Sequence, residues 1–371
     1  MSKELGLAVL RADYPGPRIP VMEHFSGLSR RAIRHFTGID PLTEQYRISE
    51  AFQRLAEILE VDLLWGGWLP SEGWSVLDWD DGDSVKINSQ GQTVVQWGIF
   101  HTVHQEDGRH FVHVPKPQTV EEALDFRPLD YFPKSVEEYR EQFRAEYAGM
   151  LASVGDICYP IPHHYTTCFH WALAIFGFEL LCLAGMEDQD RFSRLMARFA
   201  EISLRITTAW SRVEGLEAFI LHDDLTTAQG PIFSPAWYRR HIFPHYPAIF
   251  RPFIDKGVPI IFTSDGNCTA FVDDIFAAGA EGLNFEWLVD IEPLVARYPD
   301  KILIGNMNSA TIAQGPKEAI EREVRRCMAI GSRARRFVVN VGGGLTHDMP
   351  VENLSYYLAL RRELARNLRA G

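Results

Sequence analysis

The chain has 371 residues, of which 46% are hydrophobic and 23% are charged. This balance allows a large buried core, and no stretch approaches the ~18 uninterrupted apolar residues of a membrane span. The 37 basic and 49 acidic residues give a net charge of −12 with the acidic residues dispersed, which argues against nucleic acid as a partner. We therefore expect a water-soluble globular protein, and the absence of a visible secretory signal predicts the cytoplasm.

Eight short apolar runs, most of which end in small polar or acidic residues, are the expected strands. They are residues 19–22, 61–65, 156–161, 218–223, 258–262, 281–286, 301–306 and 336–344. Helical sequence lies between most of them, which indicates parallel strands. Eight such strands predict an α/β fold of the (β/α)8 barrel type, and the length above the usual ~250 residues predicts insertions.

One region departs from this rhythm. Residues 75–116 are rich in Val, Thr, Trp and His, with the turn signals Asp81-Gly82, Gln90-Gly91 and Asp107-Gly108 between strand-like runs. This pattern predicts a β meander of about four short strands. We expect it to be an insertion within a single domain of residues 1–371, serving as a lid or as the arm of a homodimer.

Polar residues follow the fifth expected strand directly, as Thr263-Ser264-Asp265-Gly266-Asn267. A buried strand that ends in this way is typical of a barrel enzyme's active site. Asp265 and Asn267 are expected either to touch substrate or to cap the following helix. Glu286 and Asn306, at the ends of the next two strands, have the same two alternatives.

His222, Asp223 and Asp224 end the fourth strand. Because adjacent strand residues face opposite ways, at most one carboxylate is expected to face the site while the other fixes a loop. His222 and Asp224 on one side are consistent with a metal site or an acid/base pair, and they are the best metal candidates. A loop-fixing aspartate is the structural alternative.

Three histidines, His163, His164 and His170, follow the third strand. His164 and His170 are six residues apart, so a two-histidine metal clamp on one helix fails on spacing. His163 or His164 is expected to be a ligand or acid at the site, or a structural histidine.

An acidic and aromatic set follows the first two strands. It consists of Glu23, His24 and Phe25 with Trp65, Trp68 and Trp74. An acid beside aromatic faces can hold a cationic or methoxylated aromatic ligand, although tryptophans in a large barrel are more often core residues.

From about Phe219 to Arg366 the chain resembles the uroporphyrinogen decarboxylase superfamily, a (β/α)8 fold that includes cobalamin-dependent methyltransferases and demethylases. The resemblance rests on His222-Asp223-Asp224-Leu225-Thr226, on Gly230 to Pro235, on Ser264-Asp265-Gly266-Asn267, on Gly282-Leu283-Asn284, and on Val341 to Gly344 followed by Pro350-Val351-Glu352-Asn353.

The chain departs from the decarboxylase itself at three places. The arginine-rich loop after the first strand corresponds to Met22 to Gly27, which contains Glu23. The aspartate expected at the end of the second strand is replaced by residues 65–68, and the Gly-His-Gly after the last strand is Gly342-Gly343-Gly344. Since carboxylate recognition needs cations, we predict that the chain does not decarboxylate uroporphyrinogen.

The methyltransferases of the superfamily typically bind zinc through a His-x-Cys pair after the fifth strand and a cysteine after the last. This chain has Thr263-Ser264-Asp265 at the first place and only glycines at the second. A thiolate zinc site is therefore not expected, and Cys268 is expected to be a packed thiol.

Three functions follow. The first, implied by the resemblance, is transfer of a methyl group from a small methoxylated or N-methylated substrate to a corrinoid on a partner protein. Glu23, His222 and Asp224 would contact substrate or metal, and Asp265 would orient the leaving group. The second is cofactor-independent decarboxylation of a small or tetrapyrrole-like acid. The third is a non-catalytic tetrapyrrole or corrinoid binder. The residues alone require no cofactor, and zinc is the metal that the first function would use.

Overall fold

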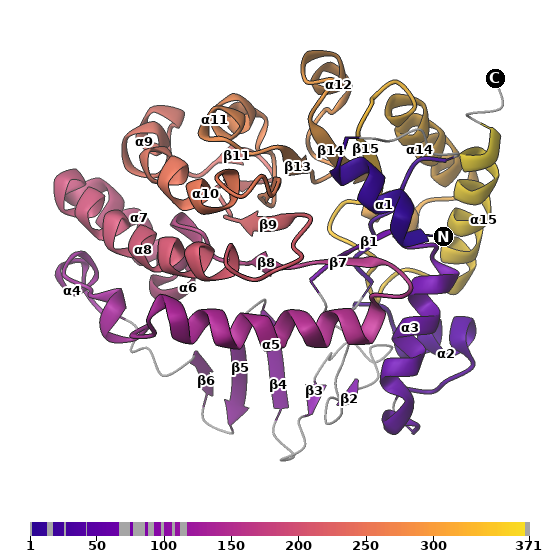
Figure 1. Cartoon of the computed structure of the whole chain (residues 1–371), viewed down its shortest axis with the longest axis horizontal. Helices are drawn as coiled ribbons and strands as arrows, with labels where there is room; N and C mark the ends of the chain where they lie inside the picture. Colours follow the sequence, from indigo (N-terminus) through magenta and orange to yellow (C-terminus); the bar gives the residue numbers. More distant parts are fainter. Residues whose placement is uncertain are drawn as a thin grey trace. The chain divides into compact units, whose positions relative to one another are not determined.

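The computed structural model describes residues 2–12, 18–25, 27–41, 43–66, 75–76, 86–87, 93–97, 100–105, 108–111 and 117–367. The chain forms two compact units, and Figure 1 labels most of their elements. Unit 1 consists of Met1–His110, Ala148–Pro162 and Asn284–Gly371, and unit 2 of Phe111–Tyr147 and His163–Leu283. None of the helices in the described residues is long and apolar enough to span a membrane.

The core of unit 1 is built on buried parallel strands. β1 (Leu63–Trp65) pairs in parallel with β7 (Tyr159–Ile161), and β14 (Ile302–Met307) pairs in parallel with β15 (Phe337–Val341). Val21 bridges to Val339 and Met22 bridges to Leu63. The expected first strand, residues 19–22, is therefore reduced to two bridging residues that join the two pairs.

The described residues of unit 1 include seven complete α-helices. They are α1 (Ser2–Leu10), α2 (Arg30–Thr37), α3 (Ile48–Ile58), α12 (Glu292–Arg297), α13 (Ser309–Gln314), α14 (Lys317–Gly331) and α15 (Val351–Asn367). On α14 the buried residues Ile320, Val324, Cys327 and Gly331 recur every three or four positions, which is the period of one helix face. This face contacts β14 and β15.

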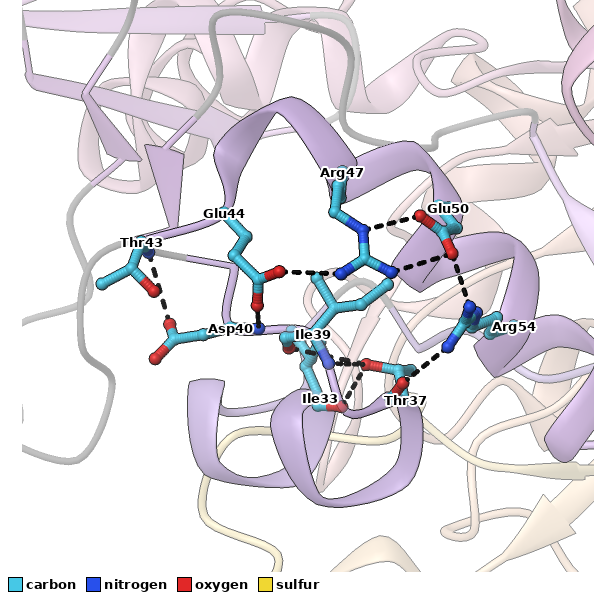
Figure 2. A network of polar contacts seen from close by, with 9 residues as sticks. All are labelled: Ile33, Thr37, Ile39, Asp40, Thr43, Glu44, Arg47, Glu50 and Arg54. Atoms are coloured by element: carbon cyan, nitrogen blue, oxygen red, sulfur yellow. Dashed lines mark hydrogen bonds and ion pairs between the residues drawn. The ribbon is translucent and has the colours of Figure 1, made fainter.

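A polar network orders the connection between α2 and α3 (Figure 2). The guanidinium of Arg47 lies 2.7 Å from Glu44 and 2.8 Å from Glu50, and Arg54 donates to both Glu50 and the carbonyl oxygen of Thr37. Because solvent screens pairs of this kind, each contributes little to stability by itself. Their joint effect is to hold the start of α3 against the end of α2.

A buried ion pair joins residue 23 to the last helix of unit 1. Glu23 and Arg361 are both fully buried, and Arg361 Nη1 lies 2.9 Å from Glu23 Oε1. The Tyr357 hydroxyl donates to the same carboxylate, and Arg361 also donates to the carbonyl oxygen of Leu59. Burial raises the pKa of Glu23, and the charge of Arg361 opposes that rise. These contacts are those of a structural ion pair and differ from the expected substrate contact, because the carboxylate is directed at α15.

We expect Arg361→Met to lower the free energy of unfolding by about 3–5 kcal/mol, because it leaves the carboxylate of Glu23 buried without its partner. The double variant Glu23→Gln, Arg361→Met removes both charges and should recover part of this loss. Urea unfolding of the wild type, both single variants and the double variant measures the coupling. Additive losses would contradict the buried pair.

Unit 2 has its own row of strands. The order is β8 (His163–His164), β9 (Phe219–His222), β12 (Ile260–Thr263) and β13 (Gly282–Asn284), of which residues 282–283 belong to this unit. β9 is parallel to both β8 and β12, and all three are buried. The carboxyl ends of these strands therefore meet at one edge.

The helices of unit 2 are mostly consecutive along the chain. They are α4 (Val120–Leu124), the part of α5 (Val136–Val154) up to Tyr147, α6 (Phe169–Phe176), α7 (Phe178–Glu187), α8 (Gln189–Trp210), α9 (Pro235–His241), α10 (Tyr246–Ile254) and α11 (Val272–Ala278). The long helix α8 contacts α7, α9 and α10. Its buried residues, among them Phe192, Met196 and Phe199, form one apolar face.

The structure confirms a mixed α/β fold with parallel strands. Seven of the eight expected runs contain strands, and the remaining one, residues 19–22, contains the two bridges. The expected β meander is also present, as β2 (Ser75–Val76), β3 (Lys86–Ile87), β4 (Thr93–Trp97), β5 (Phe100–Gln105) and β6 (Gly108–Phe111) in sequential order. Within the described residues it has five strands, where about four were expected. Trp68 and Trp74 lie outside the described residues.

Candidate functional site

The polar cluster of unit 2 lies where β9 and β12 end. The register pairs His222 with Thr263, so the residues that follow each strand emerge at the same edge. His222 Nε2 lies 3.1 Å from Asp224 Oδ1 and 3.7 Å from Asp265 Oδ1. The backbone N–H of Asp265 also donates to Asp224 Oδ1 at 3.0 Å. The structure therefore brings together the three residues that the sequence suggested as catalytic.

A second imidazole lies on the other side of the Asp224 carboxylate. His170, in the first turn of α6, has its Nδ1 2.8 Å from Asp224 Oδ2. This nitrogen is shielded from solvent and lacks the alignment of a hydrogen bond. Asp224 thus stands between two histidines, with one oxygen toward each.

The charges of the cluster stabilise one another. Burial opposes ionisation of Asp224, but His222 and His170 together outweigh it and hold the pKa of Asp224 well below its usual range. Burial likewise disfavours protonation of His222, yet Asp224 and Asp265 raise its pKa well above the ordinary value. His222 is 1% exposed, whereas the Asp265 side chain is 58% exposed, so the cluster reaches from the interior to solvent.

Asp223 points the opposite way from Asp224 and orders the loop before α6. Its carboxylate accepts hydrogen bonds from the backbone N–H groups of Cys168, Phe169 and His170 at 2.9, 3.0 and 2.6 Å. The hydroxyl of Tyr246 donates to it at 2.8 Å. The expected division of the two carboxylates is confirmed, because Asp223 fixes the start of α6 while Asp224 faces the cluster.

We predict that Asp223→Ala lowers the free energy of unfolding by about 3 kcal/mol or more, because four buried donors lose their acceptor and each unsatisfied donor costs roughly 1–3 kcal/mol. The matched change Asp224→Ala leaves one backbone donor, the N–H of Asp265, without its acceptor, and His222 can give up its proton, so the loss should be smaller than that of Asp223→Ala. Urea unfolding of both variants makes the comparison. Equal losses would show that the two aspartates do not have separate roles.

Tyr165 closes one side of the cluster. Its carbonyl oxygen lies 2.9 Å from His222 Nδ1, and its ring centroid lies 4.1 Å from that of His222 and 5.4 Å from that of His170. Burial raises the pKa of Tyr165, and the charges of Asp265 and Asp224 add to the rise. The phenol therefore stays neutral and acts as an apolar wall with a polar end.

His164 lies deeper than the cluster. It is 2% exposed, with Nε2 3.4 Å from Ser203 Oγ and its ring 5.8 Å from that of Trp171. Burial lowers the pKa of His164 to about 3, and the neighbouring His163 and His222 contribute to this decrease. A neutral histidine packed against Trp171 is a structural residue, which is the second of the two alternatives for His164.

The buried imidazole of His164 predicts an acid-sensitive fold. The unfolded chain takes up a proton at this residue as the pH falls below about 6.5, whereas the folded chain does so only near pH 3. The free energy of unfolding should therefore decrease as the pH is lowered through this window. His164→Gln should reduce the loss between pH 7 and pH 5 by about 1–2 kcal/mol, measured by urea unfolding. The exposed His35, changed to Gln, is the control, and an unchanged slope in His164→Gln would contradict the prediction.

The remaining predicted site residues have local structural contacts. Asn267 Oδ1 accepts from the backbone and hydroxyl of Thr269, which is the capping alternative. In unit 1, Asn306 donates to the carbonyl oxygen of Val289 at 2.6 Å and accepts from Arg326 at 3.1 Å. Glu286 is half-buried, and its carbonyl oxygen accepts from Asn306.

The aromatic set of unit 1 divides into core and surface. Phe25 is 2% exposed and stacks on Phe52 with centroids 6.0 Å apart, so it is a core residue. His24 is exposed, and its ring lies 6.2 Å from that of the half-buried Trp65. A substrate contact by His24 and Trp65 stays a prediction.

His170 is the residue that the sequence analysis left out of the site. The spacing of His164 and His170 was considered only for a shared helix face. In the structure His170, on α6, instead contacts Asp224, which directly follows the end of β9. The usable signal was the aspartate beside Asp224, because a buried carboxylate at the end of a strand is able to cap the preceding helix. That cap is the contact that carries His170 to the cluster.

The nitrogen and oxygen donors of the cluster could hold a metal ion, whereas the thiolate site implied by the resemblance has no counterpart here. One donor atom from each of His170, His222 and Asp224 lies within 4.8 Å of the others. At the place where the resemblance would put a His-x-Cys pair, the chain has Thr263-Ser264-Asp265, so Asp265 stands where the thiol is expected. Cys268 is fully buried, as expected for a packed thiol. The residues therefore do not fit a thiolate zinc site.

Comparison with known proteins gives three results. The sequence pattern of the family described as uroporphyrinogen decarboxylase (URO-D) matches residues 168–364. The uroporphyrinogen decarboxylase of Thermus thermophilus is 28% identical over 178 residues, which are 48% of this chain and 50% of that protein. That of Salinispora tropica is 30% identical over 183 residues, 48% and 46% of the two chains. The chain thus spans about half the length of the curated relatives it matches.

A solved structure extends the likeness to the whole chain. A methyltransferase from Methanosarcina mazei superposes with a TM-score of 0.62 over 98% of each chain, at 17% sequence identity. At this identity the similarity is one of fold.

Proposed function

Because the chain belongs to the uroporphyrinogen decarboxylase family, we propose that it is a methyl-transferring enzyme of that family. Its substrate is a small methoxylated or N-methylated molecule, and the methyl acceptor is a corrinoid carried by a partner protein. The observation that carries this proposal is the cluster of His170, His222, Asp224 and Asp265 at the carboxyl edge of β9 and β12. The proposal includes closure of the eight parallel segments into a (β/α)8 barrel, with this edge at its mouth.

Demethylation needs an electrophile at the leaving atom. When the bond from carbon to oxygen or nitrogen breaks, the heteroatom keeps the bonding electron pair, and a proton or cation must stabilise the charge that develops. In the metal-free cluster a protonated His222, whose pKa is raised, would supply the proton. With a cation held by the donor atoms of the cluster, the cation would take over that role. The corrinoid, when bound, would supply the electron pair that takes the methyl group. Asp265, exposed beside His222, would orient the substrate.

The charge of the cluster opposes a polycarboxylate substrate. Asp224 and Asp265 are the acidic members, and bidentate arginine is the group that carboxylate recognition needs. In the same unit, Arg239 pairs with Asp274 at 2.8 Å and Arg240 with Asp190 at 2.8 Å, both at the surface. This distribution supports the prediction that uroporphyrinogen is not the substrate.

The curated relatives favour a second candidate, decarboxylation of a small acid without a cofactor. Two carboxylates beside the imidazoles would repel the carboxylate of such a substrate, so this candidate ranks below methyl transfer. A non-catalytic corrinoid binder, the third alternative, would neither transfer a methyl group nor release carbon dioxide.

The test uses free cob(I)alamin as the methyl acceptor with a panel of methoxylated aromatic compounds and methylamines. We expect methylcobalamin to form, followed by its absorption spectrum, and His222→Ala to slow the reaction by about 100-fold or more, the scale of a general acid. His35→Ala, a change at an exposed histidine of unit 1, is the control and should retain the wild-type rate.

Two outcomes would contradict the proposal. One is the absence of methylcobalamin with every donor in the presence of a folded protein. The other is a wild-type rate in His222→Ala. Release of carbon dioxide from a panel of small carboxylic acids, without methyl transfer, would support the second candidate instead.

A further inference from the structure

We propose that His170, His222 and Asp224 are the protein ligands of a divalent transition metal, of which zinc is the best match. The three come from α6, from the end of β9 and from the residues directly after it. This inference deepens the proposed function by naming its electrophile, but metal binding is measured without reference to activity.

The distances suit a common ion. His222 Nε2 and His170 Nδ1 lie 3.1 and 2.8 Å from the two oxygens of Asp224. In a tetrahedral zinc site with bonds of about 2.0 Å, neighbouring ligand atoms are about 3.3 Å apart. Both histidine-to-aspartate distances are within about 0.5 Å of this separation, and one donor atom from each of the three residues lies within 4.8 Å of the others, so an ion would draw the donors closer together.

His222 is oriented as a ligand. Its Nδ1 lies 2.9 Å from the carbonyl oxygen of Tyr165, which can only accept, so Nδ1 must carry the proton of this hydrogen bond. In the neutral imidazole the lone pair is then on Nε2, directed at Asp224. Metal-binding histidines are held in this way, with the second ring nitrogen bonded to a carbonyl or carboxylate.

His170 Nδ1 gives the independent observation. It is buried and faces Asp224 Oδ2 at 2.8 Å, but without the alignment of a hydrogen bond. This nitrogen contacts the carboxylate but is poorly aligned to donate a proton to it. Its lone pair is therefore well placed to bind a cation. A cation between the two satisfies both lone pairs at once.

The donor set selects the class of metal. Two imidazoles and one carboxylate suit zinc and its neighbours in the first transition row, while Mg²⁺ and Ca²⁺ prefer oxygen donors alone. Three protein ligands leave a further position for water or substrate, which is the arrangement of catalytic zinc. The exposed Asp265, whose Oδ1 is 3.7 Å from His222 Nε2, lies beside that position.

The experiment measures metal binding to the full chain. Protein stripped with a chelator is titrated with Zn²⁺ by calorimetry, and we expect one equivalent to bind. His170→Ala, His222→Ala and Asp224→Ala should each weaken binding at least 100-fold, while His35→Ala binds as the wild type does. Co²⁺ in place of Zn²⁺ should give the visible absorption of a four- or five-coordinate site, lost in the same three variants.

Folding of the variants is controlled in two ways. Circular dichroism reports whether each variant is folded, and Zn²⁺ should raise the thermal midpoint of the stripped wild type, since a ligand that binds only the folded state stabilises it. No binding to the folded wild type, or unchanged affinity in His170→Ala, would overturn the inference. Zinc binding without methyl transfer would leave the site standing and refute the proposed function. Methyl transfer at full rate by metal-free protein would support the proposed function and refute the metal as its electrophile.

Discussion

The carboxylate of Asp223 is the constraint on which the site depends. It gathers three backbone N–H groups of residues 168–170 and the hydroxyl of Tyr246 around one buried charge. Because a buried carboxylate is stable only when its oxygens are satisfied, the start of α6 has little freedom to move away from the end of β9. The position of His170 relative to His222 follows from this contact.

Because successive side chains of a β-strand point to opposite faces, three consecutive residues at the end of β9 have two different roles. His222 and Asp224 face the cluster, and Asp223 between them faces the loop that carries His170. The carbonyl oxygen of His222 accepts from both the backbone and the hydroxyl of Thr167, which ties the same loop to the strand from its main chain. Side chains held in this way by bonded loops and buried strands lose little entropy on binding a small molecule or an ion.

The parts of the fold that depend on local pattern were predictable. Short apolar runs identify the strands because a buried parallel strand has no polar face to interrupt them. The pairing of His222 with Asp224 followed from strand alternation in the same way.

The residues that were misplaced depend on contacts distant in sequence. Glu23 looks like an exposed acidic loop until Arg361, 338 residues later, is known to be its partner. His170 looks isolated until Asp223, 53 residues later, is known to cap its helix. No spacing rule within one element reports such contacts, and neither does composition.

The distance in sequence between Glu23 and Arg361 has a consequence for synthesis of the chain. On the ribosome, Glu23 emerges long before the helix that neutralises it, and until then its carboxylate must stay in water. The strands β8, β9 and β12 have their strand partners and the Asp223 cap available much earlier. The order of translation therefore favours assembly of the polar cluster of unit 2 before the core of unit 1 is complete, with α15 as the element whose arrival allows that core to close.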